Sequence, residues 1–424
     1  MKKFLYSLLV ICLLLACAFM GYKLYYPNPI VVHAHNFDEK MTYSVIGSKA
    51  YVNRKCECGS IQHTELTNYI IARPTTAQDI LNGDINGKTI VFADGDYGNL
   101  EINVTRDTLS AINEYLPEDK NIKGELIDLE LIDELSEVGA YHYTRNLENV
   151  TFAGTPNANF NGLFNIHSKV YCFYNWMSDK AIGVENSTSL KVDPIRDIGL
   201  KDINNNGLID ENDIGYIQHI NVINVSFENM NFEGKNGRML FAYEVDADVS
   251  NIDFINCTFE TDEIFYQKDS TIGFGAIHIE VRLGSIAGIE IEDIIIENCE
   301  FNGHYQAINI RRVNNVKILN NTIKNTEHNA INLQGFGTKG DILIKGNIIE
   351  NTQDRAIRFA NLENAQVVVE NNTFVNCTDD AGELIKTQTQ NVDSTIEMLN
   401  NTYNSKAIEN KVYDGNQIIV VMGE

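Results

Sequence analysis

Positive charge is scarce in this chain. Its 424 residues include 33 Lys and Arg against 58 Asp and Glu, which gives a formal net charge of −25 at pH 7. Proteins that bind nucleic acids neutralise phosphates with a surplus of Lys and Arg, so this composition disfavours a nucleic-acid partner. It also disfavours broad binding to an anionic membrane surface. A local basic groove remains compatible with it.

The chain also lacks the four clustered Cys and His ligands of a structural zinc site. Cys56 and Cys58 are separated by one residue, and His63 follows nearby. A structural zinc site needs four ligands, and no second Cys or His pair accompanies these three residues. We therefore expect Cys56 and Cys58 to form a local disulfide or to be free thiols.

What the chain does contain is a repeat. From Asn224 onward, two apolar residues alternate with other residues and are followed by Asn, about every 25 residues. The position that closes each unit holds Asn229, Asn256, Asn298, Asn320, Gly346, Asn371 and Asn400, and three residues later come Phe232, Phe259, Phe301, Ile323, Ile349, Phe374 and Tyr403. A fixed period in this range predicts a repeat architecture.

The repeat has the period of strands. Alternation of apolar and polar residues indicates β-strands, because successive strand side chains point to opposite faces. Asn and Gly share a tolerance of left-handed backbone, so the closing position is expected to be a tight corner between two strands. If the corners stack about 4.8 Å apart, each Asn amide can bond its neighbour along the axis. Gly346 would then interrupt that ladder.

A second strand follows in the same repeats. Four runs align without gaps, beginning at Ala276, Ala307, Ala330 and Ala356, and a fifth follows more loosely at Leu384. This alignment places five polar residues in one row: His278, Asn309, Asn332, Arg358 and Lys386. The isoleucines beside the row do not alternate cleanly, which leaves both inward and outward orientations open.

These repeats resemble the right-handed parallel β-helix superfamily, the pectate-lyase-like fold, from about Thr89 to the C-terminus. The resemblance implies an all-β solenoid, which we assign to residues 76–424, with residues 155–223 as an insertion. Residues 76–100 are expected to cover the open end with a small helical cap, in which Thr76 precedes a short helix over residues 77–81. Residues 23–75 read as an extracellular linker.

The N-terminus resembles a targeting segment. Lys2 and Lys3 precede an apolar run from Phe4 to Met20. Residues 1–22 therefore predict a signal anchor with a cytoplasmic N-terminus. The alternative is a lipoprotein signal, with lipidation of Cys17 in Leu14–Cys17. Both interpretations tether the chain to a membrane, by residues 4–22 or by the lipid, and place the remainder at the cell surface.

Residues 202–213 have the spacing of a calcium loop. Asp202, Asn204, Asn206, Asp210 and Asp213 supply oxygen side chains, Leu208 would contribute its carbonyl, and Gly207 stands at the sharp turn. Asp at the last position resembles the dockerin type of loop. Dockerins carry two copies and this chain has one, so a cohesin partner is not implied. We expect one structural Ca²⁺ ion.

The fold resemblance also implies a class of chemistry. β-Helix enzymes that cleave or epimerise uronate polymers need a cation to neutralise the substrate carboxylate and a base to remove the neighbouring proton. We assign Arg358 or Lys386 as base or carboxylate clamp, His278 or His328 as proton shuttle, and Glu280 as partner of the histidine. Further candidates over the same coils are Arg282, His304, Arg311, Arg312, Asp354 and Arg355.

A hydrolase would instead need two carboxylates across a groove. The only pair in the pattern is Glu280 with Asp354, about three coils or ~14 Å apart, which is too far for a retaining mechanism. None of the signature runs of pectate lyases, polygalacturonases or chondroitinase-like enzymes is present. The leading prediction is a lyase or epimerase acting on an extracellular acidic polysaccharide. The alternative is a non-catalytic surface protein that binds glycan or acts as a spacer, in which the row is a solvated face.

Two further cysteines fit the repeat. Cys257 and Cys299 each follow a corner Asn directly. Because Cys is small and often buried, we expect them to stack inside the coils without a chemical role.

Overall fold

A computed structural model describes residues 37–103, 147–167, 220–233, 240–242, 247–261, 275–281, 291–387 and 391–421. The chain divides into two compact units, residues 1–41 with 53–63, and residues 42–52 with 64–424. The predicted anchor at 1–22 and the predicted calcium loop at 202–213 lie outside the described residues. Within the described residues, no helix is long and apolar enough to cross a membrane.

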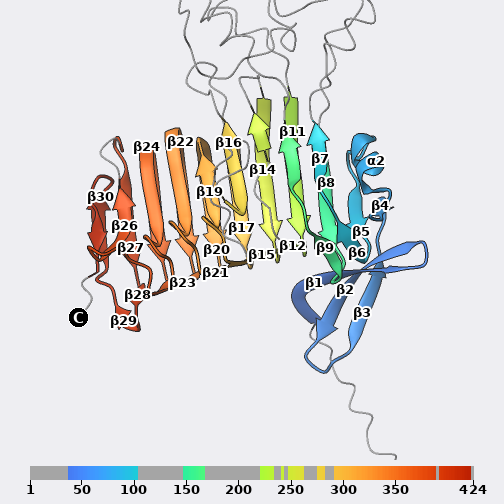
Figure 1. Cartoon of the computed structure of the whole chain (residues 1–424), viewed down its shortest axis with the longest axis horizontal. Coiled ribbons are helices and arrows are strands. Elements are labelled where there is room, and N and C mark those ends of the chain that lie inside the picture. The colour runs from blue at the N-terminus through green and yellow to red at the C-terminus, as the bar shows by residue number, and fades with distance from the viewer. Residues whose placement is uncertain are drawn as a thin grey trace, which may run out of the picture. The chain divides into compact units, whose positions relative to one another are not determined.

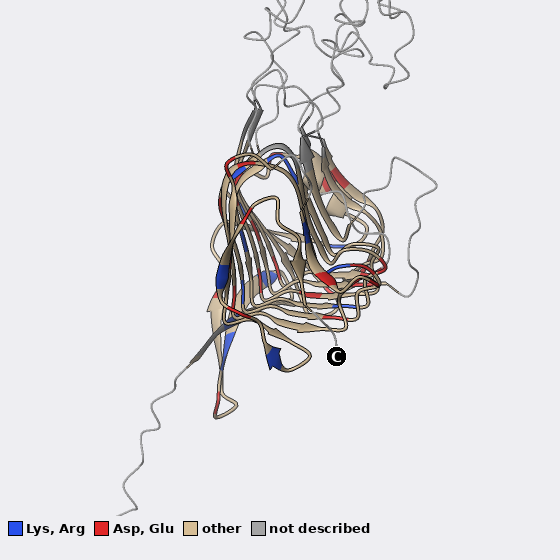
Figure 2. Cartoon of the chain, turned by 90° about the vertical axis from the view of Figure 1, so that its left-hand side faces the viewer, with Lys and Arg blue, Asp and Glu red and all other residues tan. Residues whose placement is uncertain are grey.

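The larger unit is a parallel β-helix, in which each turn of the chain adds one short strand to each of three columns (Figure 1). Seen from its C-terminal end, the coils superimpose around a common interior (Figure 2). We number the columns in the order in which the chain visits them.

Column 1 contains β4 (Tyr69–Ala72), β5 (Thr89–Phe92), β8 (Leu147–Gly154), β11 (Ile220–Glu228), β14 (Ala247–Ile255), β17 (Ile291–Glu297), β20 (Val313–Leu319), the second parts of β22 (Ile331–Lys345) and β24 (Ile357–Glu370), and β27 (Thr395–Leu399). Column 2 contains β6 (Gly95–Tyr97), β9 (Ala158–Phe160), β12 (Asn231–Glu233), β15 (Thr258–Glu260), β18 (Glu300–Asn302), β21 (Thr322–Lys324), β23 (Ile348–Glu350), β25 (Thr373–Val375) and β28 (Thr402–Tyr403), with β29 (Lys406–Ala407) at its end. Column 3 contains β7 (Leu100–Asn103), β10 (Phe164–His167), β13 (Leu240–Ala242), β16 (Ile277–Val281), β19 (Ile308–Arg311), the first parts of β22 and β24, and β26 (Glu383–Thr387).

The corners between columns 1 and 2 have the predicted backbone. Asn229 has φ 53°, Asn298 φ 54° and Gly346 φ 68°, and the other predicted corner residues are also left-handed. Only Gly, Asn and Asp adopt this conformation at little cost, which explains why these residues recur there. The prediction of tight left-handed corners is confirmed.

The asparagine ladder, in contrast, runs one residue later than predicted. Asn321, Asn347, Asn372 and Asn401 directly follow the corners and are buried. The Nδ2 of Asn321 donates to Oδ1 of Asn347 at 3.0 Å, and the same contact joins Asn347 to Asn372 at 2.9 Å and Asn372 to Asn401 at 3.0 Å. Gly346 therefore does not interrupt the ladder, because the left-handed corner turns the next side chain inward.

The interior of the coils is filled by aligned apolar side chains. Phe232, Phe259 and Phe301 stack with ring centroids 4.9 and 4.8 Å apart. Cys257 and Cys299 are buried free thiols, as expected. They follow the corners of earlier coils at the same position as the asparagines of the ladder. In column 3, Ile277 and Ile279 are both buried in the core, so the residue between them faces outward. This resolves the orientation that the sequence leaves open.

Both ends of the coil are covered. Helix α2 (Ala77–Asn82) buries Ala77 and Leu81 at the N-terminal end, which confirms the predicted cap helix. Thr76 precedes it, but its side chain makes no capping bond to the helix. At the other end, β30 (Lys411–Asp414) and β31 (Ile419–Val420) pair antiparallel with β27 and β26.

Several strands lie outside the predicted solenoid boundaries. β4 joins column 1 ahead of residue 76, and β9, β10 and the start of β11 fall inside the range 155–223 predicted as an insertion. Within the predicted linker, β1 (Phe37–Ile46), β2 (Lys49–Cys56) and β3 (Ile61–Glu65) form a three-stranded sheet. Tyr43 and Ala50 of this sheet pack on Val91 and Ala153, whose side chains point out of column 1.

Candidate functional site

The predicted polar row exists and lies on the outer face of column 3. The register pairs His278 with Asn309, Asn309 with Asn332, Asn332 with Arg358, and Arg358 with Lys386. A chain of side-chain hydrogen bonds connects the first four. Asn309 Nδ2 lies 3.1 Å from His278 Nδ1, Asn332 donates to Asn309 at 3.0 Å, and Arg358 donates to Asn332 at 3.1 Å.

His328 stands beside this row, at the corner that precedes β22. Its Nδ1 lies 3.0 Å from Oδ2 of Asp354, which occupies the equivalent corner of the next coil. The ring of Tyr305, one coil earlier, contacts the imidazole edge to face, with centroids 5.2 Å apart. The backbone N–H of Asn329 also lies 2.8 Å from Nδ1. The Nδ2 of Asn329 lies 2.5 Å from Nδ1 as well. With the proton on Nδ1, the ring donates to Asp354 and carries its lone pair on Nε2, whereas with the lone pair on Nδ1 it accepts from Asn329.

Arg355 organises the carboxylates around this histidine. Its guanidinium pairs with Asp354, with Asp379 at 2.5 Å and with Glu383 at 2.6 Å. All four side chains are mostly buried, with 14 to 21% of their side-chain surface exposed. Asp354 is therefore held between two partners, Arg355 and His328.

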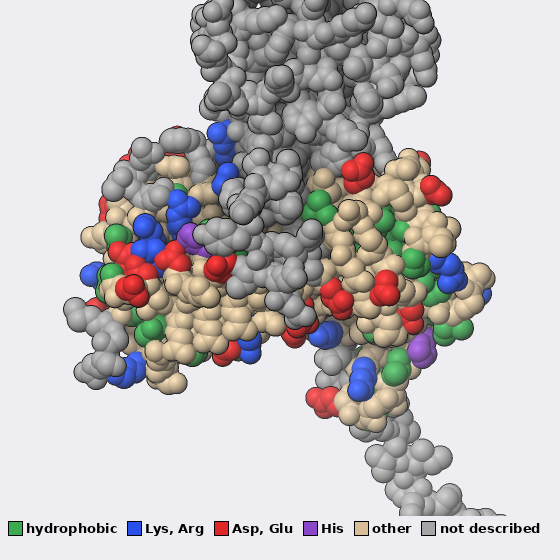
Figure 3. Space-filling view, in the orientation of Figure 1, with side chains coloured by type: hydrophobic (Ala, Val, Ile, Leu, Met, Phe, Trp, Pro, Cys, Tyr) green, Lys and Arg blue, Asp and Glu red, His purple; other side chains and the backbone are tan. Residues whose placement is uncertain are grey.

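Arg358 and Lys386, the two cations of the row, differ from Arg355 in their partners. Arg358 donates to the amide oxygens of Asn332 and Gln334, and neither Arg358 nor Lys386 forms an ion pair with a residue that the structure describes. They lie on adjacent strands in direct register, about 4.8 Å apart along the axis. Basic and acidic side chains gather with a histidine at this end of the face in Figure 3.

The surroundings make His328 a neutral group at pH 7. Burial lowers the pKa of His328, and the nearby Arg358, Arg355 and Lys386 lower it further, while Asp354 acts in the opposite direction. Burial and the charge of Arg311 likewise lower the pKa of Arg358. A neutral imidazole that is oriented by a carboxylate can accept a proton, and neighbouring cations can hold an anion beside it.

The structure brings together His328, Arg358 and Lys386 but not every predicted residue. His278 is only 1% exposed and lies two coils, about 10 Å, from the coil of His328, so the two histidines do not share a site. Glu280 of β16 pairs in register with Arg311 of β19. The side chain of Glu280 lies outside the described part of the chain. Arg282 is likewise not described. His304 is buried, which lowers its pKa to about 4.

Sequence reasoning missed Asp379 and Glu383. They bind Arg355 together with Asp354, so the carboxylates that come together here are Asp354, Asp379 and Glu383. The available signal was the position of Glu383, which stands two residues before Ile385 as Arg355 stands two residues before its register partner Ile357. A looser corner with several extra residues obscured that match.

No metal centre is found in the part of the chain that the structure describes: no group of three or more His, Cys, Asp or Glu is placed to hold an ion there. No disulfide joins Cys56 to Cys58. The six predicted calcium ligands, Asp202, Asn204, Asn206, Leu208, Asp210 and Asp213, lie outside the described residues.

Comparison with known families agrees with this architecture. Residues 217–412 match the family model described as the right-handed β-helix region. That range includes β22, β24 and β26 and hence the whole polar cluster. This part of the chain is a right-handed parallel β-helix. The sequence matches no curated protein.

Comparison with solved structures finds similarity only at low sequence identity and low TM-score. PfbA, a surface adhesin of Streptococcus pneumoniae, is 14% identical, with 77% of this chain and 86% of PfbA covered at a TM-score of 0.29. A polygalacturonase from Erwinia carotovora is 11% identical, with 80% and 96% covered at a TM-score of 0.25. An exopolygalacturonase from Thermotoga maritima is 12% identical, with 84% and 96% covered at a TM-score of 0.27.

Proposed function

We propose that the outer face of β22, β24 and β26 binds an acidic polysaccharide and acts on it by a lyase- or epimerase-type reaction. The observation that carries this proposal is a pair of cations, Arg358 and Lys386, that have no carboxylate partner among the described residues and lie beside the His328–Asp354 pair. The net charge of −25 already favours solubility, so solubility does not explain two such cations on one face. They suit an anionic group supplied by a ligand.

The proposed chemistry starts at the uronate carboxylate. Arg358 and Lys386 bind it, and their charge stabilises the negative charge that develops when the neighbouring carbon loses its proton. Nε2 of His328 accepts that proton, and Asp354 stabilises the imidazolium that forms. Arg355 is a positioning residue, because it binds Oδ1 of Asp354 while His328 contacts Oδ2.

Two outcomes follow from the same carbanion. In a lyase, the bond from the adjacent carbon to the glycosidic oxygen breaks, a carbon–carbon double bond forms, and the leaving oxygen takes a proton from water. In an epimerase, a proton returns to the same carbon from the opposite face of the ring. In both, His328 must be neutral when substrate binds, which fits its lowered pKa.

Incubation of the protein with a panel of acidic and neutral polysaccharides tests the proposal. Ultraviolet absorbance of unsaturated uronates together with new reducing ends would identify a lyase. Incorporation of deuterium from heavy water without chain cleavage would identify an epimerase. Reducing ends alone would indicate hydrolysis and contradict the proposed reaction.

A second candidate is a non-catalytic glycan-binding protein of the cell surface. It is favoured by Arg355, whose charge is fully engaged by Asp354, Asp379 and Glu383, as in a structural network. The His328→Gln variant distinguishes the two functions. Retained binding with lost product formation supports the enzyme, whereas binding without any product in the unsubstituted protein supports the binding protein.

Surface location and calcium belong to the same proposal. The apolar run at residues 4–22, or a lipid on Cys17, would tether the β-helix outside the cytoplasm, where acidic polysaccharides occur. Extracellular calcium would fill the loop at 202–213. Radiolabelled fatty acid incorporation that is lost in Cys17→Ser would identify the lipoprotein form, and its absence would favour the spanning anchor.

A further inference from the structure

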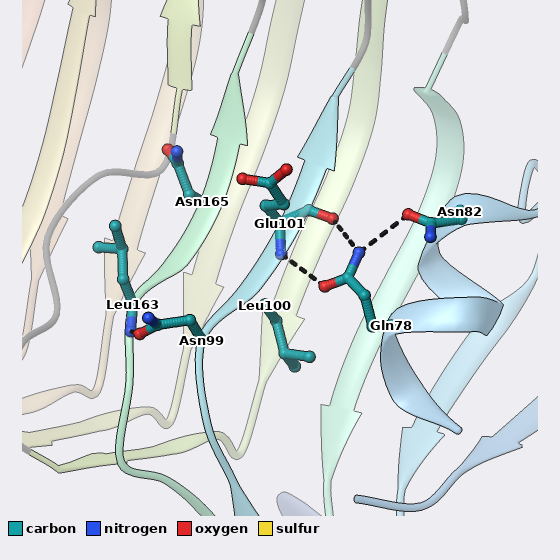
Figure 4. A pocket seen from close by; sticks show the side chains of 7 residues that line it. All are labelled: Gln78, Asn82, Asn99, Leu100, Glu101, Leu163 and Asn165. Atoms are coloured by element: carbon teal, nitrogen blue, oxygen red, sulfur yellow. Dashed lines mark hydrogen bonds between the residues drawn. The ribbon is translucent and has the colours of Figure 1, made fainter. Parts of the chain in front are cut away.

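A polar pocket lies at the opposite end of column 3 from the His328 cluster. It has a volume of about 430 Å³ and lies between α2, β7 and β10 (Figure 4). Its lining residues are Gln78, Asn82, Asn99, Leu100, Glu101, Leu163 and Asn165. Four of the seven carry side-chain amides, one carries a carboxylate, and none carries a positive charge.

The pocket opens on the same outer face as the polar row. Glu101 pairs in register with Asn165, and Ile166, the next residue, aligns through Leu240 with Ile279. Asn165 is therefore in the same row as His278 and, four strands further, Lys386. Five coils separate Asn165 from Arg358, a distance of about 24 Å.

Some of the side-chain amides that line the pocket are hydrogen-bonded to its walls. Gln78 bonds both backbone groups of Glu101, accepting from its N–H at 3.0 Å and donating to its carbonyl at 2.9 Å, which attaches α2 to the exposed edge of β7. Gln78 also donates to Oδ1 of Asn82 at 2.9 Å, and Oδ1 of Asn99 accepts from the N–H of Leu163 at 2.9 Å. These contacts fix the orientation of the Asn82 and Asn99 amides.

The remaining amide groups are left for a ligand. Oδ1 of Asn165 is buried and has no hydrogen-bond partner, although a buried carbonyl oxygen without a donor is unfavourable. The Nδ2 groups of Asn82 and Asn99 supply donors on the other sides of the same pocket. A molecule with several hydroxyl groups can satisfy such a set, because each hydroxyl both donates and accepts.

We propose that this pocket is a binding site for an uncharged sugar residue. A hydroxyl donor would satisfy Oδ1 of Asn165, hydroxyl oxygens would accept from Asn82 and Asn99, and Leu163 would contact an apolar edge of the ring. The carboxylate of Glu101 would repel a uronate, which distinguishes this pocket from the Arg358 end of the same row. The site requires no reaction at His328, and it stands whether or not the proposed enzyme activity does.

Saturation-transfer NMR on the full-length protein tests the site with matched sugars: glucose and galactose against glucuronate and galacturonate. We expect transfer to at least one uncharged sugar and little to its acidic partner. Asn165→Leu removes the unpaired oxygen at similar volume, so it should weaken binding of the uncharged sugar about tenfold while leaving the thermal midpoint unchanged or higher. Arg358→Gln should leave that binding unchanged, because it lies about 24 Å away.

Two results would overturn the proposal. One is the absence of transfer to every uncharged sugar tested, and the other is equal binding to Asn165→Leu and the unsubstituted protein. Glu101→Gln tests the charge preference separately. It should allow the uronate to compete, and unchanged selection against the uronate would rule out the role given to Glu101. Lost uronate-polymer activity in Arg358→Gln with retained sugar binding would separate the two sites.

Discussion

Nδ1 of His328 lies 3.0 Å from Oδ2 of Asp354, at equivalent corners of two successive coils. A stacked repeat brings together side chains 26 positions apart in the sequence by simple register. The same stacking sets Arg358 and Lys386 in line on the adjacent strands. The chemistry proposed for this face depends on how these four side chains affect one another.

The first prediction concerns the pKa of His328. Because positive neighbours disfavour the imidazolium, replacing Arg358 or Lys386 with Gln should raise this pKa toward its ordinary value. The acidic limb of the activity profile should then shift to higher pH. NMR titration of the imidazole, assigned with His328→Gln, measures the effect. Lys324→Gln is the matched control, since Lys324 pairs with Glu350 in column 2.

The same pKa has a consequence for stability. His328 has a lower pKa in the folded chain than the ordinary value of about 6.5, so the unfolded chain binds protons more readily. Stability should therefore decrease as pH falls below about 6.5, and His328→Gln should reduce that decrease. A pKa of His328 that stays the same in Arg358→Gln and Lys386→Gln would contradict the electrostatic coupling on which both expectations rest.

The second prediction separates Asp354 from the other carboxylates. Asp354→Asn keeps the shape but removes the charge that orients His328 and stabilises its protonated form, so kcat/KM should fall about 100-fold through kcat. Asp379→Asn is the control, because Asp379 contacts Arg355 and leaves the His328 contact intact. Steady-state kinetics on a uronate polymer measure both. Equal losses in the two variants would indicate a structural network without a catalytic histidine.

The third prediction concerns calcium. If residues 202–213 bind Ca²⁺, the ion should raise the thermal midpoint, and Asp202→Ala should abolish that rise because it removes the first ligand. Asn205→Ala provides the control, since position 4 of such a loop supplies no side-chain ligand. Scanning fluorimetry with Ca²⁺ and with chelator is the measurement. A midpoint that does not respond to Ca²⁺ would rule out the loop as a metal site.

The fold was accessible from sequence because its determinants are local. Each left-handed corner needs Asn or Gly, and each strand needs alternation, so both recur visibly. The ladder was harder to place, because Asn320 and Asn321, like Asn371 and Asn372, are adjacent and identical. Only the corner conformation decides which of the two side chains turns inward. The strands β1 to β3 gave no signal, since they pair with one another and not with the repeats.

The candidate site was also predicted only in part from the sequence. The row containing Arg358 and Lys386 follows from alignment of short runs, and the structure confirms it. The Arg355 network does not follow, because Asp379 and Glu383 reach Arg355 from a corner of a different length. The isolation of His278 also depends on its burial, which a row of polar residues does not reveal.

The fourth prediction tests the asparagine ladder against the corners. Oδ1 of Asn347 accepts from the N–H and the Nδ2 of Asn321, and its Nδ2 donates to the carbonyl of Ile318 and to Asn372. Asn347→Ala removes all four of these buried hydrogen bonds, so it should lower the free energy of unfolding by about 3 kcal/mol or more. Asn371→Gly should cost at most about 1 kcal/mol, because Gly tolerates the left-handed corner, as Gly346 does one coil earlier.

Denaturant unfolding of the two variants and the unsubstituted protein measures this difference. The comparison isolates the inward amide from the corner conformation, since Asn347 and Asn371 occupy adjacent positions of the repeat in successive coils. Equal destabilisation would mean that the corner backbone, and not the ladder of buried amides, holds successive coils in register. A larger loss in Asn347→Ala would show that the coils are held by amide contacts one residue beyond the position that the repeat makes most conspicuous.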